Sequence, residues 1–360
     1  MKERLKVAVV DIFKSYCRIC EALERKGHKA FFICAGKEAP RFEKTRIPIS
    51  YWKRTLILPY KRIPFLHNFT NQPLVPHLLS ILKRLDPHIV NVHEHSHITS
   101  SYPPTLLKER WKVVLTEHGC SWGRKRDKLL TPIAKYFLFP LVDAFVAITP
   151  AAKKFLEING VKNVKVIGNP VDCELFTPDT RIEDRDDIIL FVGRLHIFKG
   201  LKYLLLAMRE VVCEIQNAKL FIIGGGPLEP LMRKLSKKYS YIRYLGPKRH
   251  EELPKYYNMA KAVVLPSIHE PFGIALAEAM ACGTPVIGSN TEGIPYVIGS
   301  SGILVPPKNH KILKEAIIKV LKDSSLAKLL SIKGRKRAVR FFSYEAVAKK
   351  YEELFYEILT

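Results

Sequence analysis

The chain has 360 residues and a formal net charge of +25 at pH 7, and 47% of its residues are apolar. This length predicts two domains that each bury a core, and the composition is that of a soluble globular protein. We expect no membrane-spanning helix, because the nearest candidate, residues 136–148, contains Pro140 and Asp143.

Cysteine usage and charge predict the compartment and the kind of partner. Seven cysteines, an odd number scattered along the chain, predict reduced thiols in the cytoplasm. Cys17 and Cys20 form a single C-x-x-C, which we interpret as incidental rather than as a redox or zinc site. The apolar N-terminal segment, interrupted at Asp11, is too short for a signal peptide. The positive charge predicts a polyanionic partner or an anionic surface.

The first half of the chain predicts a Rossmann-like sheet. Residues 4–13 begin with an apolar strand, residues 15–26 are compatible with a helix that ends before Gly27, and residues 29–36 form a second strand. This β-α-β order is typical of an open α/β sheet, in which ligands bind at the carboxyl ends of the strands.

Histidines follow two later apolar strands of the first half. His93, His95 and His97 alternate at the end of one strand, and Glu117 and His118 end another. A zinc site is one interpretation of the alternating histidines, but we favour a strand that ends near the first of them and a loop at the ligand-binding edge. For His118 the alternative to a ligand-facing role is that of a buried structural histidine.

Two strand–loop–helix segments in the second half carry residues suited to a phosphate. Residues 188–208 contain a strand, a loop and a helix. Arg194 and Lys199 lie in that loop, where a pyrophosphate needs positive charge. Residues 219–235 contain a strand, a triple-glycine turn that includes Gly225, and a helix. These glycines permit close approach of a nucleotide, although a plain tight turn explains them nearly as well.

The segment Ser267–Ile287 follows an apolar strand and places two acids around the start of a helix. Glu270 lies in the loop, Gly273 allows close backbone approach, and a small apolar helix begins at Ile274. Its first N–H groups suit a phosphate, and Glu278 lies about 7.5 Å beyond Gly273, at the depth of an attached diol. The alternative is that Glu270 is a solvated loop acid and Glu278 a salt-bridged surface residue.

The phrase EPFGIALAEAMACGTPVI, Glu270–Ile287, resembles the E-x7-E segment of the group 1 family of retaining nucleotide-sugar glycosyltransferases, which have the two-domain GT-B fold. The sequence FVGRL....KG around Arg194 and Lys199 resembles the diphosphate clamp of the same family. The resemblance implies an α/β fold with two Rossmann-like domains that face each other across a cleft. It also implies that a C-terminal helix, Tyr344–Leu359, crosses back to the first domain.

The expected domain limits follow from this resemblance and from a charged segment in the middle of the chain. We predict an acceptor domain (1–176), a linker (177–187), a nucleotide-sugar donor domain (188–342) and a crossover helix (343–360). The linker lacks apolar periodicity. Its Asp184-Arg185-Asp186 matches the D-x-D with which another glycosyltransferase class holds a divalent ion, but a match in a charged linker is incidental, and we predict no metal site.

The resemblance also assigns roles to individual residues. It implies that Glu270 and His118 contact the donor sugar, that Glu278 contacts the ribose diol, and that Arg194 and Lys199 bind the diphosphate. The predicted catalytic residues are Glu270, His118, Arg194 and Lys199. The predicted donor-binding residues are Arg194, Lys199, Gly225, Glu270, Pro271, Phe272, Gly273, Ile274 and Glu278. The chain departs from the family at residues 11–19, which contain no glycine where a glycine-rich loop is usual.

These observations predict a hexosyltransferase that moves a sugar from a nucleotide-diphosphate sugar to an acceptor with retention of anomeric configuration, without a metal or a bound cofactor. The expected partners are the nucleotide sugar and a carbohydrate or lipid-linked acceptor, and no nucleic acid. Basic runs with aromatic neighbours at residues 51–54, 61–65 and 123–128 predict docking on anionic lipid at the inner face of the membrane. A solvated charged surface is the alternative interpretation of these runs.

Two other functions are compatible with parts of this evidence. A GT-B-shaped sugar-nucleotide epimerase or hydrolase would share the donor site, and would differ in releasing the nucleotide without an acceptor. A basic nucleic-acid-binding protein would explain the charge, but the chain has no aromatic-interleaved sheet or helix-turn-helix signature.

Overall fold

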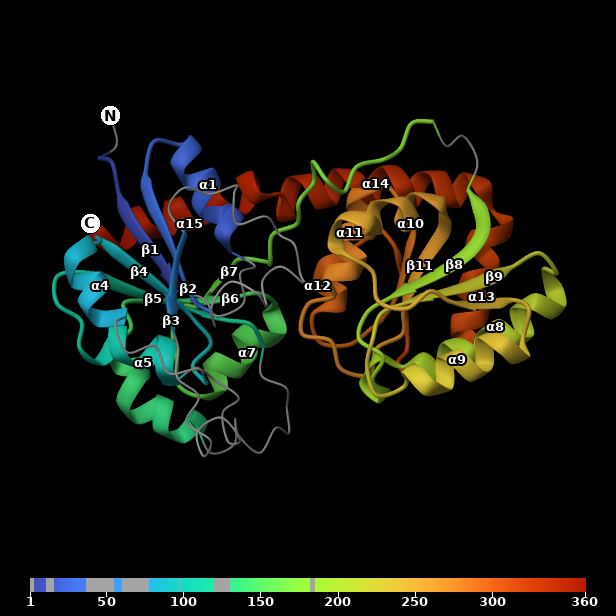
Figure 1. Ribbon diagram of the computed structural model, residues 1–360, viewed down its shortest axis with the longest axis horizontal. Helices are drawn as coiled ribbons and strands as arrows, with labels where there is room; N and C mark the ends of the chain where they lie inside the picture. The colour runs from blue at the N-terminus through green and yellow to red at the C-terminus, as the bar shows by residue number, and fades with distance from the viewer. Residues whose placement is uncertain are drawn as a thin grey trace. The chain divides into compact units, whose positions relative to one another are not determined.

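The computed structural model describes residues 3–10, 16–36, 55–59, 78–96, 98–119, 130–181 and 185–360. The chain forms two compact units: Met1–Pro170 together with Tyr344–Thr360, and Val171–Ser343 (Figure 1). The functional domain limits predicted above, 1–176, 177–187, 188–342 and 343–360, stay predictions. The two units are described in turn.

The described part of the first unit contains a parallel sheet with the order β3-β2-β1-β4-β5-β6-β7. Its strands are β1 (Lys6–Val10), β2 (Lys29–Gly36), β3 (Thr55–Pro59), β4 (Ile89–His93), β5 (Lys112–Glu117), β6 (Ala144–Ala147) and β7 (Lys165–Val166). Every residue of β4 and all but the first of β5 are buried. Strands that are covered on both faces are rich in apolar residues. The buried polar residues of β4 and β5 are Asn91, His93, Thr116 and Glu117.

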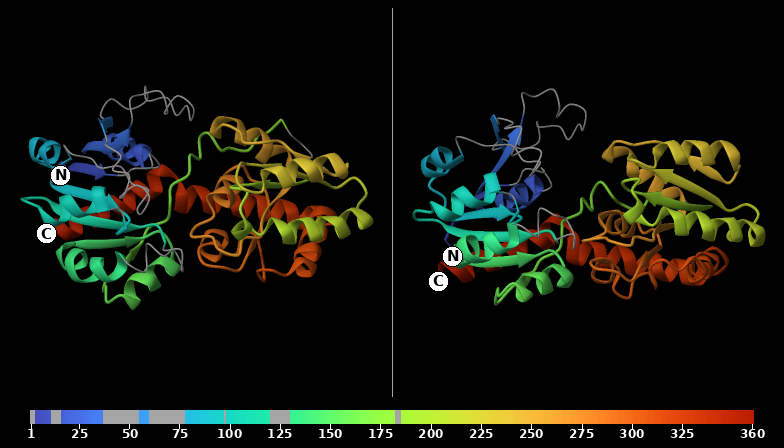
Figure 2. Two further views of the ribbon diagram at one scale, coloured as in Figure 1. Left: turned by 60° about the horizontal axis from the view of Figure 1, so that its bottom comes forward. Right: turned by 90° about the horizontal axis from the view of Figure 1, so that it is seen from below.

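Helices cover this first sheet. They are α1 (Cys17–Arg25), α4 (Leu78–Leu85), α5 (Ile98–Leu106), the π-helix η2 (Ala134–Leu138), the 3-10 helix η3 (Phe139–Leu141), α7 (Pro150–Ile158) and α15 (Tyr344–Leu359). The last of these, the C-terminal helix, runs beside α1 (Figure 2). Its Tyr351 and Phe355 are buried in the same core as Ile19 and Leu23 of α1. The prediction that the final helix joins the first unit is confirmed.

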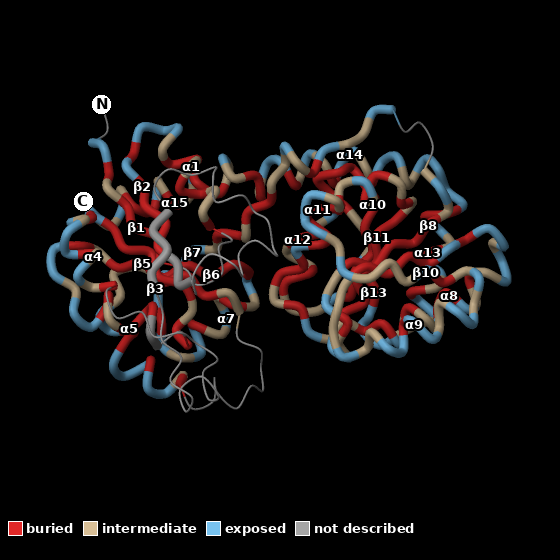
Figure 3. Tube along the Cα trace, viewed as in Figure 1, coloured by how far each residue is buried: buried red, intermediate tan, exposed pale blue. Residues whose placement is uncertain are grey.

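The second unit repeats the plan with the strand order β10-β9-β8-β11-β12-β13, again all parallel. Its strands are β8 (Asp186–Val192), β9 (Lys219–Ile223), β10 (Ile242–Tyr244), β11 (Ala260–Leu265), β12 (Val286–Ser289) and β13 (Ile303–Val305). The central strands of both sheets are buried along most of their length (Figure 3). Burying each large apolar side chain stabilises the fold by roughly 1.5–3 kcal/mol.

Helices lie on both faces of the second sheet. They are the 3-10 helix η4 (Ile197–Lys199), α8 (Leu201–Glu214), α9 (Glu229–Lys238), the 3-10 helix η5 (His250–Glu252), α10 (Leu253–Met259), α11 (Ile274–Ala281), α12 (Ile294–Ile298), α13 (His310–Lys322) and α14 (Ser324–Phe342). In Figure 1, α10, α11 and α14 lie on one side of the sheet and α8, α9 and α13 on the other. The strand order reverses between β8 and β11, and this reversal is where a doubly wound sheet binds a ligand beyond its carboxyl ends.

Candidate functional site

Glu270 and Lys199 meet at the carboxyl edge of the second sheet. Glu270 lies on the loop after β11 and is only 7% exposed. Lys199 ends η4 after β8, and its Nζ lies 2.5 Å from Glu270 Oε2. The hydroxyl of Ser267 donates a hydrogen bond of 3.3 Å to the same carboxylate oxygen. These side chains come together because β8 and β11 are neighbours in the sheet.

The two loops that carry this pair are locked together through their backbones. Gly200, at φ +70°, lies so close to Pro266 that a Cβ there would be 1.8 Å from the Pro266 carbonyl oxygen. The N–H of Ile268 donates a hydrogen bond of 2.7 Å to the carbonyl of Phe198. Position 200 therefore requires glycine, both for its left-handed backbone and for its lack of a side chain.

Positive groups surround the same edge. Arg194, on the connection that follows β8, is exposed, and no ion pair involves its guanidinium within the described part of the chain. Gly273, at φ +94°, precedes the first residue of α11. The first N–H groups of a helix have no intrahelical acceptor and carry partial positive charge. An anionic group such as a diphosphate is therefore the ligand that this edge favours.

The residues around Gly273 differ in what they can offer a ligand. The Phe272 ring is buried and packs edge-on against Phe342, with 5.5 Å between ring centroids. Its side chain belongs to the core, so only its backbone can serve the predicted contact. The neighbouring Pro271 is half-buried, whereas the Ile274 side chain is 41% exposed.

Glu278 is buried on α11, and both of its carboxylate oxygens accept hydrogen bonds. His250 Nε2 lies 2.8 Å from Oε1, and the Tyr257 hydroxyl donates to Oε2 over 2.8 Å. Burial and the charge of Glu278 raise the pKa of Tyr257 well above its ordinary value. Glu278 is thus a buried, hydrogen-bonded acid, and the alternative of a salt-bridged surface residue is excluded. Glu270, buried beside Lys199, is likewise not a solvated loop acid.

The triple-glycine turn after β9 divides into two structural glycines and one that the fold does not require. A Cβ on Gly224 would lie 1.9 Å from the Gly193 carbonyl oxygen, and one on Gly226 would lie 2.7 Å from the Leu195 carbonyl oxygen. A Cβ on Gly225 would meet no atom within 3.7 Å, its nearest neighbour being Glu229 Oε2 at 3.8 Å. Gly225 therefore differs from Gly224 and Gly226 in having open space beside its Cα, which a ligand could occupy.

His118 lies in the first unit, after β5, and is half-buried. Its Nε2 is 2.7 Å from Nδ1 of the buried His93, which ends β4. The ring of Tyr16 packs edge-on against both histidines. Since only one proton can lie between the two nitrogens, this contact couples the tautomer of His118 to that of His93. The structure therefore gives His118 a partner that sequence reasoning did not assign.

The first two of the alternating histidines, His93 and His95, have different partners. The strand ends at His93, as favoured above, and His95 turns instead to Glu117, with 2.6 Å between its Nδ1 and the carboxylate. His97 lies outside the described residues. Among the residues that the structure describes, no three His, Cys, Asp or Glu side chains are arranged to hold a metal ion.

Several predicted features lie outside the described residues. These are the part of the glycine-free loop at residues 11–15, the basic runs at 51–54, 61–65 and 123–128, and Asp184 of the D-x-D spelling. No helix among the described residues is long and apolar enough to span a membrane.

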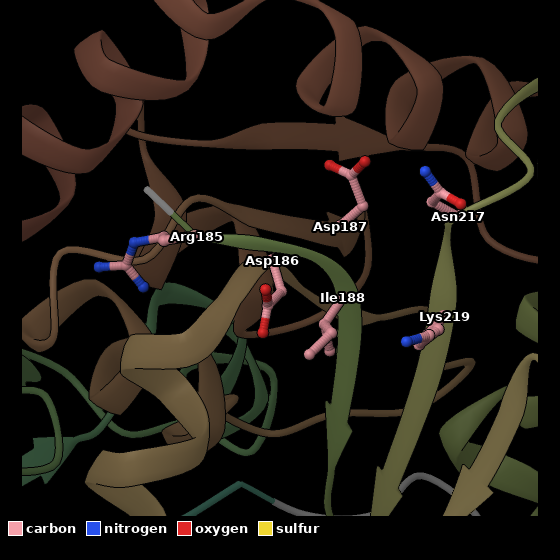
Figure 4. A pocket seen from close by; sticks show the side chains of 6 residues that line it. All are labelled: Arg185, Asp186, Asp187, Ile188, Asn217 and Lys219. Carbon is pink, nitrogen blue, oxygen red and sulfur yellow. The ribbon is translucent and has the colours of Figure 1, made fainter. Parts of the chain in front are cut away.

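A pocket at the amino ends of β8 and β9 lies at the opposite end of these strands from the candidate site. It is lined by Arg185, Asp186, Asp187, Ile188, Asn217 and Lys219 (Figure 4). The guanidinium of Arg185 is occupied by carbonyl oxygens, including those of Tyr257 and Cys282. Arg185 therefore ties the start of β8 to the C-terminal ends of α10 and α11 within the second unit.

Sequence reasoning missed the residues that hold the two acids. His250, Tyr257 and Ser267 bind carboxylate oxygens, and Glu292 accepts a 2.7 Å hydrogen bond from the backbone N–H of Glu270. A buried acid requires donors, and that requirement was the available signal. It does not say which polar residues would supply them, because Ser267 lies 3 positions from its acid whereas His250 and Tyr257 lie 28 and 21 positions from theirs.

Solved structures share the whole fold. Sucrose-phosphate synthase from Thermosynechococcus elongatus superposes with a TM-score of 0.79 at 22% identity, over 99% of each chain. An Anabaena protein in complex with UDP and glucose superposes with a TM-score of 0.75 at 15% identity, over 98% of this chain and 100% of that one. Two doubly wound parallel sheets and a C-terminal helix that packs on the first of them define a protein of the GT-B fold class. The fold prediction is confirmed.

Sequence comparisons then give the family. The model for glycosyl transferases group 1 matches residues 174–337, and the model for glycosyltransferase family 4 matches residues 14–175. The chain belongs to the group 1 glycosyltransferases of family 4, as its E-x7-E segment predicts.

Curated relatives match over part of their length. An uncharacterized glycosyltransferase of Methanocaldococcus jannaschii is 37% identical over 47% of this chain and 44% of its own. D-inositol 3-phosphate glycosyltransferase of Corynebacterium jeikeium is 32% identical over 53% of this chain and 52% of its own. The chain thus matches about half the length of these two relatives.

Proposed function

We propose that this protein transfers a sugar from a nucleotide-diphosphate sugar to an acceptor hydroxyl, with retention at the anomeric carbon. The observation that carries the proposal is the carboxyl edge of the second sheet. There Glu270 is paired with Lys199, and α11 begins beside the loop and carries Glu278 further along its axis. UDP and glucose occupy an Anabaena protein of the same fold, which supports a nucleoside diphosphate and a sugar as the ligands.

Each residue receives a role that its surroundings suit. Lys199 has three donors, so it can bind a phosphate oxygen while it keeps its contact with Glu270. Arg194 and the N–H groups at the start of α11 supply further positive charge to the diphosphate. Glu270 accepts hydrogen bonds from the donor sugar, Glu278 accepts them from the ribose diol, and Gly225 leaves room for the nucleotide. In the first unit, His118 binds the donor sugar.

The reaction breaks the bond between the anomeric carbon and the diphosphate oxygen, and forms a bond from that carbon to the acceptor oxygen on the same face of the sugar. The acceptor hydroxyl passes its proton to the departing diphosphate oxygen, which carries away the bonding electron pair. Negative charge therefore grows on the diphosphate, where Arg194, Lys199 and the start of α11 stabilise it. This electrostatic term is the main catalytic contribution that we assign to the protein.

The acceptor is a carbohydrate or a lipid-linked saccharide, reached at the cytoplasmic face of an anionic membrane. Support for the lipid-linked class comes from η2 in the first unit, where Tyr136 is 72% exposed and Phe137 is 65% exposed. Lys135 precedes them and is also exposed. Exposed aromatic side chains next to cations are typical of segments that bind the interface of an anionic bilayer.

Nucleoside diphosphate release tests this proposal. UDP-glucose, UDP-N-acetylglucosamine, GDP-mannose and ADP-glucose are incubated with soluble acceptors, and with lipid-linked acceptors in anionic vesicles. We expect release to depend on an acceptor, and we expect Lys199→Ala and Glu270→Ala each to lower it by about two orders of magnitude or more, because each removes transition-state or donor-sugar contacts. Lys202→Ala and Glu315→Ala, at exposed positions on α8 and α13, are the controls. Release without any acceptor would indicate a hydrolase or an epimerase, and near-normal rates in the two site variants would refute their roles.

A further inference from the structure

The turn between β12 and α12 is hydrogen-bonded onto the loop that carries Glu270. The hydroxyl of Thr291 donates to the Ile268 carbonyl over 3.1 Å. The backbone N–H of Glu270 donates to Glu292 Oε2 over 2.7 Å, and the N–H of Gly293 donates to the Glu270 carbonyl over 3.0 Å. Both backbone polar groups of Glu270 are therefore bound by two consecutive residues of this turn.

Glu292 makes its contact from an unfavourable backbone conformation. Its φ is +43°, in the left-handed region where a residue with a Cβ is strained and where glycine is the usual solution. The next residue is a glycine for another reason: at Gly293 a Cβ would lie 2.1 Å from the Pro271 carbonyl oxygen. A glycine at position 292 would relieve the strain, yet the chain has a glutamate there. The carboxylate must therefore contribute something that a glycine would lose.

The carboxylate of Glu292 contacts Glu270 and the residue before it. Besides the Glu270 N–H, it contacts His269, with 3.1 Å between Oε1 and the ring Nδ1. The side chain of Glu270 is held from the other direction by Lys199 and Ser267. Glu270 is thus fixed at both its main chain and its side chain, and the contact of its backbone N–H depends on one strained residue. Strained residues concentrate at functional sites, where the surrounding structure maintains them.

We propose that Glu292 is a positioning residue for Glu270: its carboxylate fixes the backbone of the loop so that the Glu270 carboxylate meets the donor sugar. The inference rests on the proposed function. Glu292 acts through Glu270 and not on the nucleotide, so its loss should affect the sugar and leave the binding of a free nucleoside diphosphate unchanged.

The test compares Glu292→Gly, Glu292→Gln and the control Glu315→Ala with the wild type. Thermal unfolding, the Kd for the free nucleoside diphosphate and kcat/KM are measured with whichever sugar of the panel above is turned over. We expect Glu292→Gly to unfold close to the wild-type temperature, because relief of its backbone strain offsets the loss of the hydrogen bond to the Glu270 N–H. We also expect it to bind the nucleoside diphosphate normally. We expect its kcat/KM to fall about 10- to 100-fold, as a misplaced reacting group does. Glu292→Gln keeps an oxygen for the Glu270 N–H and should recover most of the rate.

Three results would overturn the inference. Wild-type kcat/KM in Glu292→Gly would show that the contact does not position Glu270. A parallel loss of nucleoside diphosphate binding and of thermal stability would show that Glu292 only holds the loop together. Equal loss of rate in Glu292→Gln and Glu292→Gly would assign the charge of Glu292 to the substrate itself. A wild type that turns over none of the four sugars would instead refute the proposed function, so the two failures are distinguishable.

Discussion

The two acids of the E-x7-E segment are held by different chemistry. Glu270 forms an ion pair with the ammonium group of Lys199, whereas Glu278 is hydrogen-bonded by the Tyr257 phenol and the His250 imidazole. A carboxylate oxygen has more than one acceptor site, so each acid keeps capacity for ligand hydroxyls while its present donors offset the cost of burial. The side chains are therefore oriented before the ligand arrives.

His250 should make part of the stability depend on pH. Burial alone would lower the pKa of His250, but its hydrogen bond to Glu278 and the charges of Glu278, Glu251 and Asp172 raise that pKa above 6.5. A group whose folded pKa is raised stabilises the fold fully below its unfolded pKa, and this contribution is lost as the pH rises through the folded pKa. We expect the stability difference between wild type and His250→Asn to be larger at about pH 6 than at about pH 9.

Tyr257→Phe is the matched control for this pH experiment. The raised pKa of Tyr257 keeps its hydroxyl protonated across this range, so the loss of its hydrogen bond to Glu278 should lower stability equally at both pH values. Denaturant unfolding measures both variants against the wild type. A His250→Asn difference that stays constant or grows with pH would show that the imidazolium does not interact favourably with Glu278.

At the level of single residues, the sequence could predict the acids and cations but not all of their partners. Lys199 and Glu270 follow strands that a doubly wound order makes adjacent, so their proximity follows from topology. The contacts of Glu278 with His250 and of Glu270 with Glu292 depend on how η5 and the turn after β12 pack. No periodicity in the sequence encodes that packing.

At the level of elements, the apolar pattern of the sequence predicts the strands well but does not predict every helix. The strands β8 and β11 are read directly from their buried apolar runs. The helix α5 is not, because it contains Pro103 and Pro104, which remove two backbone donors from its interior. The end of the helix is held by a tertiary contact, in which the carbonyl of Pro104 accepts a hydrogen bond of 3.0 Å from the Trp111 indole. Tertiary contacts of this kind override local propensity.

The turn after β9 gives a prediction at this scale. Gly224→Ala would place a Cβ 1.9 Å from the Gly193 carbonyl oxygen at φ +140°, and we expect it to destabilise the fold by about 1–3 kcal/mol or more. Gly225→Ala has room in the free protein, so we expect an unchanged unfolding temperature and a donor KM raised about tenfold, because the methyl group occupies space that the nucleotide needs. Thermal unfolding and donor titration separate the two effects. Unchanged KM in Gly225→Ala would exclude Gly225 from the donor site.

At the level of the whole molecule, alternating strands and helices predicted parallel sheets, and the family resemblance implied a final helix that returns to the first unit. Both predictions are confirmed. The reason is physical: a sheet buried on both faces needs apolar strands, and parallel strands need crossover helices. The net charge of +25 says less than the strand pattern does, because it predicts an anionic partner without locating the surface that binds it. The basic runs that would locate it lie outside the described residues.

The central claim is that Glu270, Glu278 and the start of α11 together bind an activated sugar. A crystal structure of the protein with the nucleotide sugar that it turns over tests this claim most directly. We expect the Glu278 carboxylate to lie within about 3.2 Å of the ribose hydroxyls, the Glu270 carboxylate within about 3.2 Å of a hydroxyl of the transferred sugar, and the diphosphate at the N-terminus of α11. A nucleotide bound away from α11, or a complex in which either carboxylate makes no contact with it, would contradict the account.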